Sequence, residues 1–219
     1  MTEQNGQAGR AGRVRRSGRT WKRALGTAAV TAAALTVAVT PADAAPATTT
    51  GTAAADVDYA TWQRDCRAAM DQALPYLKER IADAAPGEKQ AIVLDIDNTS
   101  LETDFGFSYP QPANRPVLEA ARYAQEHGVA LFFVTARPGI IGAPTEWNLD
   151  HAGYDSSGLY VRGFLDLFRN VAEYKTAQRA HIESKGYTII ANIGNTPTDL
   201  SGGHAEKAFK LPDYDGQLS

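Results

Sequence analysis

The sequence predicts an α/β domain in which helices flank a parallel sheet, with a further helical segment before the first strand. Three short apolar runs rich in β-branched residues, 91–94, 129–134 and 187–193, are typical of buried strands. Amphipathic patterns alternate with these runs, which favours a parallel sheet built with right-handed crossovers. Each run ends directly in polar residues, and open α/β sheets bind ligands at the carboxyl ends of their strands. That edge of the sheet is therefore the predicted place for chemistry.

The first 44 residues have the pattern of a secretory signal peptide. Seven basic residues lie between Arg10 and Arg23, a charge-free Ala-rich run covers 24–40, and Ala42-Asp43-Ala44 has small residues in an Ala-x-Ala pattern. We therefore expect a secreted protein that is cleaved after Ala44. The Arg15-Arg16 pair leaves the export route open between the general and the twin-arginine pathway.

The mature chain divides into a linker and one folded domain. Residues 45–55 are rich in Ala, Thr, Pro and Gly and predict a disordered linker, while 56–219 form the domain. A membrane anchor is the alternative interpretation of the leader, but its apolar run is short and Ala-rich for a spanning helix. No stable membrane association is therefore expected.

Charge and cysteine content exclude some classes of protein. Without the leader the chain has 15 Lys and Arg against 23 Asp and Glu, a net charge of −8, which repels a nucleic-acid backbone. We therefore expect no nucleic-acid partner. Cys66 is the sole cysteine, so no internal disulfide can form, and its place in a helical pattern predicts a small buried hydrophobe.

A helical segment precedes the sheet. Asp58 can cap a helix that begins near Tyr59, and apolar residues recur at spacings of three and four. Pro75 is expected to kink this helix or to start a second one that reaches Ala84. The residues that define the apolar face are Trp62, Cys66, Ala69 and Ala73.

Two acidic residues follow the first strand without a break. Asp95 and Asp97 are two apart, so in an extended chain they project to the same side. Two such carboxylates repel each other unless a cation lies between them or one holds a proton. Asn98 and Thr99 then turn the chain and supply further polar atoms. The alternative is an ordinary turn at a strand end, for which Asp and Asn are common residues.

A long aromatic loop and a helix lead to the second strand. Residues 101–114 are expected to form either a small flap over a pocket or a cover for the core. Pro116 suits the first turn of a helix that Gly128 ends. Several aromatic side chains could stack on an aryl group or a nucleotide base, or could belong to the core: Phe105, Phe107, Tyr109, Trp147 and Tyr154.

The second and third strands end in polar groups as well. Thr135 and Arg137 follow the second strand, and a hydroxyl and a guanidinium there can hold a phosphate. The alternatives are a turn hydroxyl with a local hydrogen bond for Thr135 and a surface ion pair for Arg137. Helices are expected over 144–151 and 171–185, with a short strand over 158–162 between them. Lys175 lies near the start of the second of these helices, and Gly194-Asn195-Thr196-Pro197-Thr198-Asp199 follows the third apolar run.

In this order the motifs resemble the haloacid dehalogenase (HAD) superfamily of phosphohydrolases. The resemblance covers Ala91 to Leu200 and rests on Asp95-Ile96-Asp97-Asn98-Thr99, Thr135, Lys175 and the Gly194 to Asp199 segment. Glu173-Tyr174-Lys175-Thr176 and Phe209-Lys210-Leu211-Pro212 are similar to the secreted class B acid phosphatases, a group that includes plant vegetative storage proteins. The resemblance implies a HAD-like Rossmannoid sheet with a flap or cap after the first strand.

The resemblance also implies the roles of the site residues. Asp95 would be the nucleophile that forms an aspartyl-phosphate, and Asp97 the general acid and base. Thr135 and Lys175 would hold the phosphoryl oxygens, with Asn98 and Arg137 as further substrate contacts. Mg²⁺ would be bound by Asp95, the backbone carbonyl of Asp97, and Asp199. The expected partner is a small phosphomonoester.

One residue departs from the family pattern. The family commonly has Gly-Asp where this chain has Gly194-Asn195, which removes one negative charge near the expected metal. An acid phosphatase is the favoured function because Asp95 is retained. The alternatives are a storage or phosphate-binding protein without turnover, and a phosphotransferase.

Overall fold

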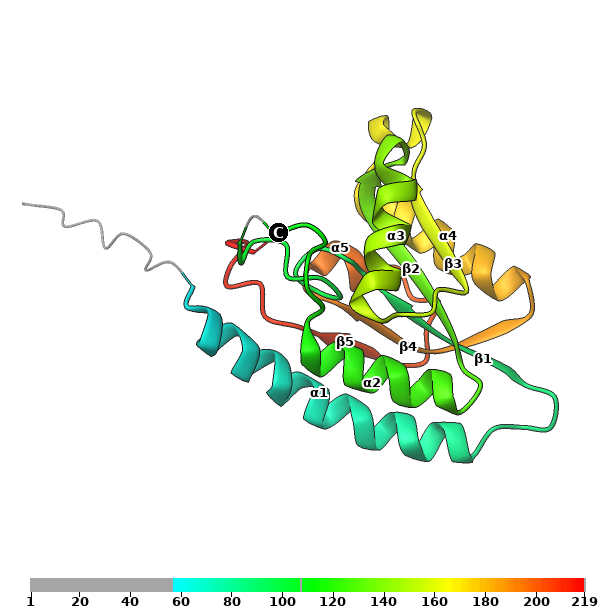
Figure 1. The fold of residues 1–219 in the computed structure, drawn as a ribbon. Helices are drawn as coiled ribbons and strands as arrows, with labels where there is room; N and C mark the ends of the chain where they lie inside the picture. The colour runs from blue at the N-terminus through cyan, green and yellow to red at the C-terminus, as the bar shows by residue number, and fades with distance from the viewer. Residues whose placement is uncertain (1–56, 107, 219) are drawn as a thin grey trace, which may run out of the picture. The chain divides into compact units, whose positions relative to one another are not determined.

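The computed structural model describes residues 57–106 and 108–218, in which five parallel strands form one sheet (Figure 1). The strand order is β3-β2-β1-β4-β5, so β1 lies in the centre. Every neighbouring pair runs parallel, which confirms the predicted sheet. The strands are β1 (Lys89–Leu94), β2 (Ala130–Pro138), β3 (Gly158–Arg162), β4 (Tyr187–Gly194) and β5 (Ala208–Lys210).

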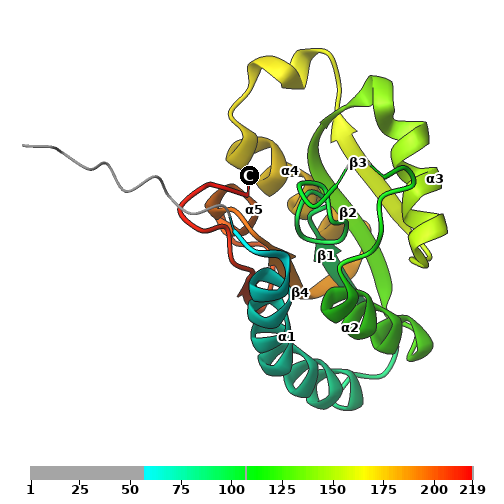
Figure 2. The same ribbon diagram turned by 60° about the vertical axis from the view of Figure 1, so that its left-hand side comes forward.

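Helices cover both faces of this sheet. Ile92 and Leu94 pack into a core cluster with α1 (Tyr59–Ala82) and α2 (Arg115–Glu126), which lie side by side (Figure 2). Ala91 and Val93 point the other way, into a second cluster with α4 (Val171–Ser184). Because successive residues of a strand face opposite sides, a sheet covered on both faces needs the unbroken apolar runs seen in the sequence.

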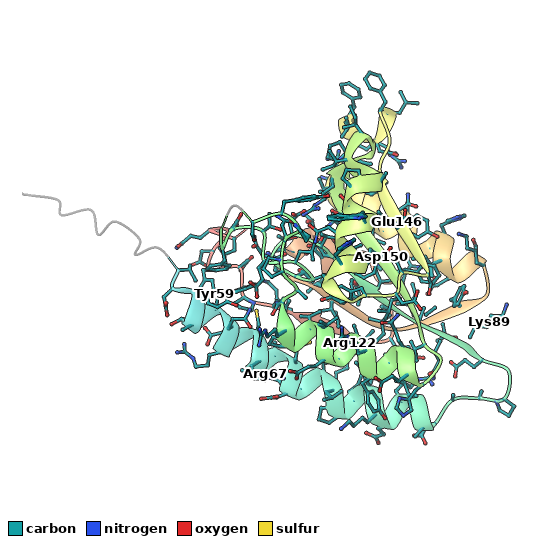
Figure 3. All side chains as sticks on the ribbon, viewed as in Figure 1. Tyr59, Arg67, Lys89, Arg122, Glu146 and Asp150 are labelled. Carbon is teal, nitrogen blue, oxygen red and sulfur yellow. The ribbon has the colours of Figure 1, made fainter. Side chains whose placement is uncertain are left out.

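The first helix is continuous through the proline that it contains. Asp58 caps it by accepting a hydrogen bond from the Thr61 backbone N–H at 3.0 Å, and Trp62, Cys66 and Ala73 are buried as expected. Of the two expectations for Pro75, the start of a second helix is wrong, because α1 continues through Pro75 to Ala82. Pro75 lies on the exposed side of the helix, so the carbonyl that loses its partner there can be hydrated. Figure 3 labels Arg67 on α1 and Arg122 on α2.

Several short elements are absent from the sequence prediction. They are β5, the four-residue helix α5 (Pro197–Leu200), and two 3₁₀ turns, η1 (Gly139–Ile141) and η2 (Leu165–Phe168). The remaining helix, α3 (Gly142–Ala152), begins two residues earlier than expected. β2 runs four residues past the predicted end at Val134 because Pro138 pairs with Arg162 of β3.

The loop after β1 both covers the core and reaches the sheet edge. The Phe105 ring stacks on Trp62 of α1, with ring centroids 4.4 Å apart. Tyr109 is 62% exposed and stacks instead on Trp147 of α3 at 5.4 Å. Phe105 therefore fits the expectation of a core cover, and Tyr109 fits the expectation of a flap. Tyr154 belongs to the core, and Phe107 lies outside the described residues.

The predicted signal peptide (1–44) and linker (45–55) also lie outside the described residues. Among the helices of the described part, none combines the length and the apolar character needed to cross a membrane.

Candidate active site

The central strand delivers two carboxylates to the carboxyl edge of the sheet. The Asp95 backbone N–H continues the β1–β4 ladder by donating to the Ile193 carbonyl at 3.0 Å, so its position is fixed by the sheet. A tight turn follows, in which the backbone N–H groups of Thr99, Ser100 and Leu101 all donate to the Ile96 carbonyl. Asp95 is 6% exposed and lies at the base of a cavity.

Asn98 organises the loop beside this strand end. Its backbone has φ of 52°, a left-handed conformation that Asn tolerates better than most residues. The side-chain amide donates to the Asp104 carboxylate at 2.7 Å, and its oxygen accepts from the Asp104 backbone N–H at 3.0 Å. Asn98 also lines the cavity. The side chain that holds the loop therefore also lies where a substrate contact was predicted.

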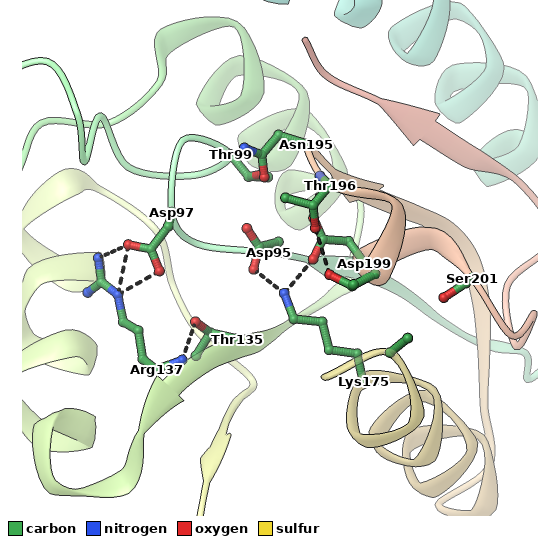
Figure 4. Close-up of polar contacts among 12 residues, drawn as sticks. Asp95, Asp97, Thr99, Thr135, Arg137, Lys175, Asn195, Thr196, Asp199 and Ser201 are labelled. Carbon is green, nitrogen blue, oxygen red and sulfur yellow. Dashed lines mark hydrogen bonds and ion pairs between the residues drawn. The ribbon is translucent and has the colours of Figure 1, made fainter. Parts of the chain in front are cut away.

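Lys175 joins the two buried carboxylates of the site (Figure 4). Its Nζ donates to Asp95 Oδ1 at 2.6 Å and also to Asp199 Oδ1. All three side chains are almost fully buried. Asp95 is 80 positions and Asp199 is 24 positions away from Lys175 in the sequence. The sequence predicts that the three residues share one edge of the sheet, and the structure places them in direct contact.

Burial and charge set the protonation of this cluster. Burial raises the pKa of Asp95 to about 6; the positive charge of Lys175 opposes that rise, and the negative charge of Asp199 adds to it. Burial disfavours the charge on Lys175, but the two carboxylates outweigh this effect and raise its pKa. The ammonium group therefore stays charged at neutral pH.

Asp199 is held by a local motif as well as by the lysine. Its Oδ2 accepts the Thr196 backbone N–H at 2.8 Å, which forms a capping box at the start of α5. Gly194 permits this close approach, because a Cβ at that position would collide with the Asp199 side chain. The Gly-Asn-Thr-Pro-Thr-Asp segment thus places a carboxylate against the end of β4.

Asp97 has a cation of its own. Arg137 Nη2 donates to Asp97 Oδ1 at 2.7 Å, and its Nε lies 3.1 Å from both carboxylate oxygens. Arg137 is further held by Gln111 Oε1 at 2.9 Å and Thr145 Oγ1 at 3.3 Å. Figure 4 shows Asp97 turned toward Arg137 while Asp95 faces Lys175. Separate cations thus relieve the repulsion that the sequence predicts between these two carboxylates.

Thr135 lies within β2, between the two ion pairs (Figure 4). It is fully buried, and its hydroxyl accepts the Arg137 backbone N–H at 3.1 Å. A hydroxyl that accepts a hydrogen bond keeps its own hydrogen for donation. Thr135 can therefore still donate to an oxyanion placed near Asp95.

Two cavities meet at Asp97. The first has a volume of about 470 Å³ and is lined by Asp95, Asp97, Asn98, Thr103, Asp104, Ala136, Val171, Lys175, Asn195, Thr196, Thr198 and Asp199. The second has about 420 Å³ and is lined by Asp97, Tyr109, Gln111, Arg137, Ile141, Pro144 and Thr145. Asp97 can thus reach a group that bridges the two spaces.

Asn195 connects the site to the end of the chain. Its amide nitrogen donates to the Leu218 carbonyl at 2.5 Å, and its oxygen accepts the Thr99 hydroxyl at 3.3 Å. Lys210 adds a bond from its Nζ to the Asn195 carbonyl at 2.6 Å. The amide therefore holds the C-terminal segment to the turn that follows Asp95.

Sequence reasoning missed a buried arginine that supports Asp199. Arg179 is 1% exposed and donates to the backbone carbonyls of Asp199 at 2.7 Å and Gly203 at 2.9 Å. Asn192 of β4 also donates to the Asp199 carbonyl, at 2.8 Å. Arg179 follows Lys175 by four residues, so their spacing on one helix face is the signal that could have identified it.

The described residues contain no cluster of three or more His, Cys, Asp or Glu side chains arranged to hold a metal. The predicted ligand set includes the backbone carbonyl of Asp97, which is not a side-chain group and so is not counted in such a cluster. The carboxylates of Asp95 and Asp199 are brought together by their shared contact with Lys175.

Comparison with known proteins adds a family and a fold. A family model described as HAD superfamily, subfamily IIIB (acid phosphatase) matches residues 16–111 and 108–217. The Stem 28 kDa and Stem 31 kDa glycoproteins of Glycine max are each 37% identical over 90 residues, or 39% of this chain. The matches cover 35% and 31% of those relatives, so this chain spans about a third of their length.

Among solved structures, the class C acid phosphatase of Bacillus anthracis has a similar fold. Its TM-score is 0.57 at 16% identity, over 72% of this chain and 80% of that chain. A second structure of that phosphatase, with tungstate bound, gives a TM-score of 0.54. At this identity the likeness is one of fold, and it agrees with the parallel sheet described above.

Proposed function

This chain belongs to the HAD superfamily, subfamily IIIB (acid phosphatase), and on that premise we propose that it is a secreted, metal-dependent phosphatase of phosphomonoesters. The observation that carries the proposal is the contact of Lys175 with the two buried carboxylates of Asp95 and Asp199 at the base of a cavity. A buried ammonium beside a carboxylate at a strand end suits the binding of a phosphoryl group that the carboxylate attacks.

The proposed reaction has two steps. Asp95 Oδ2 accepts no hydrogen bond from the described residues, whereas Oδ1 is held by Lys175, so Oδ2 is the oxygen free to attack phosphorus. The new bond joins this oxygen to phosphorus as the ester P–O bond breaks, and Asp97 gives a proton to the leaving alcohol. Water then attacks the aspartyl-phosphate, Asp97 takes its proton, and phosphate and free Asp95 are released.

The neighbouring groups stabilise the oxygens of the transferred phosphoryl group. Lys175 and the Thr135 hydroxyl both lie beside Asp95, where their donors meet charge that develops during attack (Figure 4). Arg137 is already aligned by Gln111 and Thr145. A substrate phosphate that binds Arg137 competes with Asp97 for it and so releases Asp97 for proton transfer.

The residues present fit a hard cation such as Mg²⁺. Two buried carboxylates share one ammonium, which leaves an excess of one negative charge, and all available donors are oxygen atoms. Asp95, the backbone carbonyl of Asp97, and Asp199 would hold the ion. Its chemical contribution would be to shield the phosphate charge from the Asp95 carboxylate.

A role in storage or phosphate binding without turnover is the second candidate. The observation that favours it is Asn195, which supplies an amide where the family commonly has a carboxylate. The two candidates differ in whether phosphate is released from an ester.

The test is hydrolysis of an aryl phosphate by the purified protein at pH 5 to 7, with Mg²⁺ and then with a chelator. Asp95→Asn is expected to lower kcat by more than ~10³-fold, as is usual for loss of a covalent nucleophile. Asp155→Asn, a matched change at an exposed residue, should leave kcat unchanged.

After an acid quench, the wild type should yield a phosphorylated peptide that contains Asp95. Turnover by Asp95→Asn at the wild-type rate would refute the covalent step, and phosphate binding without any turnover would favour storage.

A further inference from the structure

The loop between β1 and α2 is closed at its base and carries two polar side chains toward Asp97. We call residues 101–106 and 108–114 of this loop the flap. Its base is closed by an antiparallel bridge between Leu101 and Ala113. The two arms that rise from this base can therefore be positioned by contacts made further out along the loop.

One side chain on each arm of the flap directs Asp97. On the first arm, the Thr103 hydroxyl donates to Asp97 Oδ1 at 2.9 Å. On the second arm, Gln111 Oε1 accepts from Arg137 Nη2 at 2.9 Å. The same nitrogen of Arg137 donates to Asp97 Oδ1 at 2.7 Å (Figure 4). The position of the Asp97 carboxylate thus depends on where both arms lie.

Asn148 of α3 holds the second arm by its backbone. The Asn148 side chain is fully buried, its Oδ1 accepts the Gln111 backbone N–H at 2.9 Å, and its Nδ2 donates to the Gln111 carbonyl at 2.8 Å. We call these two hydrogen bonds the latch. They resemble the pair that two strands exchange in an antiparallel sheet. Without them, both backbone groups of Gln111 would need water, so the arm would have to move outward.

The same helix also aligns Arg137 directly. Thr145 precedes Asn148 by three residues, so the two side chains lie on one face of α3. Thr145 Oγ1 accepts from Arg137 Nη1 at 3.3 Å. Arg137 is therefore held from α3 at one nitrogen and from the flap at the other, and the latch fixes the distance between these two supports.

The two cavities show what the position of Asp97 controls. Asp95 and Lys175 line the first cavity, Gln111 lines the second, and Asp97 lines both. In the proposed reaction the phosphoryl group is transferred to Asp95, so the leaving alcohol extends past Asp97 toward the second cavity. Displacement of Asp97 would then impair protonation of the leaving oxygen more than attack by Asp95.

We propose that Asn148 is a positioning residue for the general acid, because its latch keeps Arg137 and Asp97 aligned on the leaving group. This inference rests on the proposed phosphatase function. In the step concerned, the bond between phosphorus and the alcohol oxygen breaks as the bond to Asp95 forms, and a proton passes from Asp97 to the departing oxygen. An alkyl alcohol needs that proton to leave, whereas nitrophenolate is stable without it.

The test compares an alkyl phosphate, glycerol phosphate, with p-nitrophenyl phosphate. The quantity compared is kcat/KM, which covers the steps up to the aspartyl-phosphate; the later hydrolysis of this intermediate is common to both esters. Asn148→Leu should lower kcat/KM for glycerol phosphate at least ~10-fold more than for the nitrophenyl ester, since small displacements of a catalytic group can cost ~100-fold. A loss of stability alone would affect the two esters equally.

Two further positions supply matched variants. Gln111 is half-buried, so Gln111→Met should fold; it removes the acceptor for Arg137 and should show the same selective loss. Gln111→Glu keeps an acceptor oxygen and should retain the wild-type ratio, because its added charge acts on the same phosphate in both esters. Leu149→Ala removes a buried core contact next to Asn148, and it should lower the thermal midpoint without changing the ratio.

Hydrogen exchange at the Gln111 backbone amide reports the latch without any turnover. Exchange should become faster in Asn148→Leu, which removes the acceptor of that amide, and should stay slow in Gln111→Met, which does not. Unchanged protection in Asn148→Leu would refute the latch.

The outcomes separate this inference from the proposed function. A wild type that hydrolyses neither ester would overturn the proposed function, and this inference with it. If the wild type hydrolyses both, equal losses for the two esters in Asn148→Leu would overturn the inference alone, as would a selective loss of the same size in Leu149→Ala. If Asn148→Leu does not fold, Gln111→Met decides by the same comparison of esters.

Discussion

Replacement of Lys175 by Met removes the charge that two buried carboxylates share. Methionine keeps most of the volume, so the change acts mainly on charge. Asp95 and Asp199 are 6% and 3% exposed, and among the described residues neither carboxylate accepts a hydrogen bond from a second cation. Loss of one partner of a buried ion pair costs about 3–5 kcal/mol, because the remaining charge stays desolvated. We expect a loss of this size in the free energy of unfolding at pH 7.

Urea unfolding, followed by tryptophan fluorescence in a buffer with a chelator, measures this loss. The chelator matters because a bound cation could replace the missing ammonium. Lys185→Met, just after the same helix, is the control, and it should change stability by less than ~1 kcal/mol because Lys185 is exposed and loses only a surface contact with Tyr160.

A double-mutant cycle then tests the assignment of the loss to charge. Asp199→Asn removes one of the carboxylates that Lys175 neutralises, so the double variant should recover part of the loss, with a coupling of about 0.5–3 kcal/mol. Two results would refute the reasoning: Lys175→Met as stable as Lys185→Met, or strictly additive effects of Lys175→Met and Asp199→Asn.

Three further predictions follow from contacts outside the central cluster. Hydrogen bonds from Arg80 lower the pKa of Glu88 to about 2, so its stabilising effect is present above its ordinary pKa and is lost as the pH falls. The difference in thermal midpoint between the wild type and Glu88→Gln should therefore shrink between about pH 5 and pH 2, and a constant difference would contradict the ion pair. Burial raises the pKa of the Cys66 thiol to about 12, so a thiol reagent at pH 8 should react only after unfolding; rapid reaction of the native protein would show that the site opens. Asn195→Asp removes the hydrogen that is donated to the Leu218 carbonyl, so hydrogen exchange in the last residues should become faster, while Thr198→Ser should leave it unchanged.

The strands and helices that sequence reasoning predicted are those whose own residues carry the signal. Apolar runs such as 91–94 are long enough to define a buried strand, and Gly158 to Arg162 was predicted with the observed bounds. β5 has three residues, of which only Phe209 is buried, so its strand character comes from pairing with β4. The continuation of α1 through Pro75 likewise comes from the packing of the whole helix, because a proline inside a helical pattern by itself favours a break.

The site was predictable as a set of residues but not as a set of contacts. Strand ends and parallel topology bring Asp95, Lys175 and Asp199 to one edge, and they do meet there. Arg137 was expected either to hold a phosphate or to form a surface ion pair, but the sequence did not identify Asp97 as its partner. Its orientation depends on Gln111 and Thr145, which come from the flap and α3 and have no signal of their own in the sequence.

The arrangement around Asn195 bears directly on whether the departure from the family pattern implies lost activity. The amide makes two different hydrogen bonds, one as donor to the Leu218 carbonyl and one as acceptor from Thr99. A carboxylate could keep only the second, because it has no hydrogen to donate, and it would face a carbonyl oxygen across a buried contact. An amide at this position is thus required by the way the C-terminal segment packs. Since that requirement is structural, Asn195 by itself is weak support for a storage protein, and the retained Asp95, Asp199 and Lys175 weigh more heavily for an enzyme.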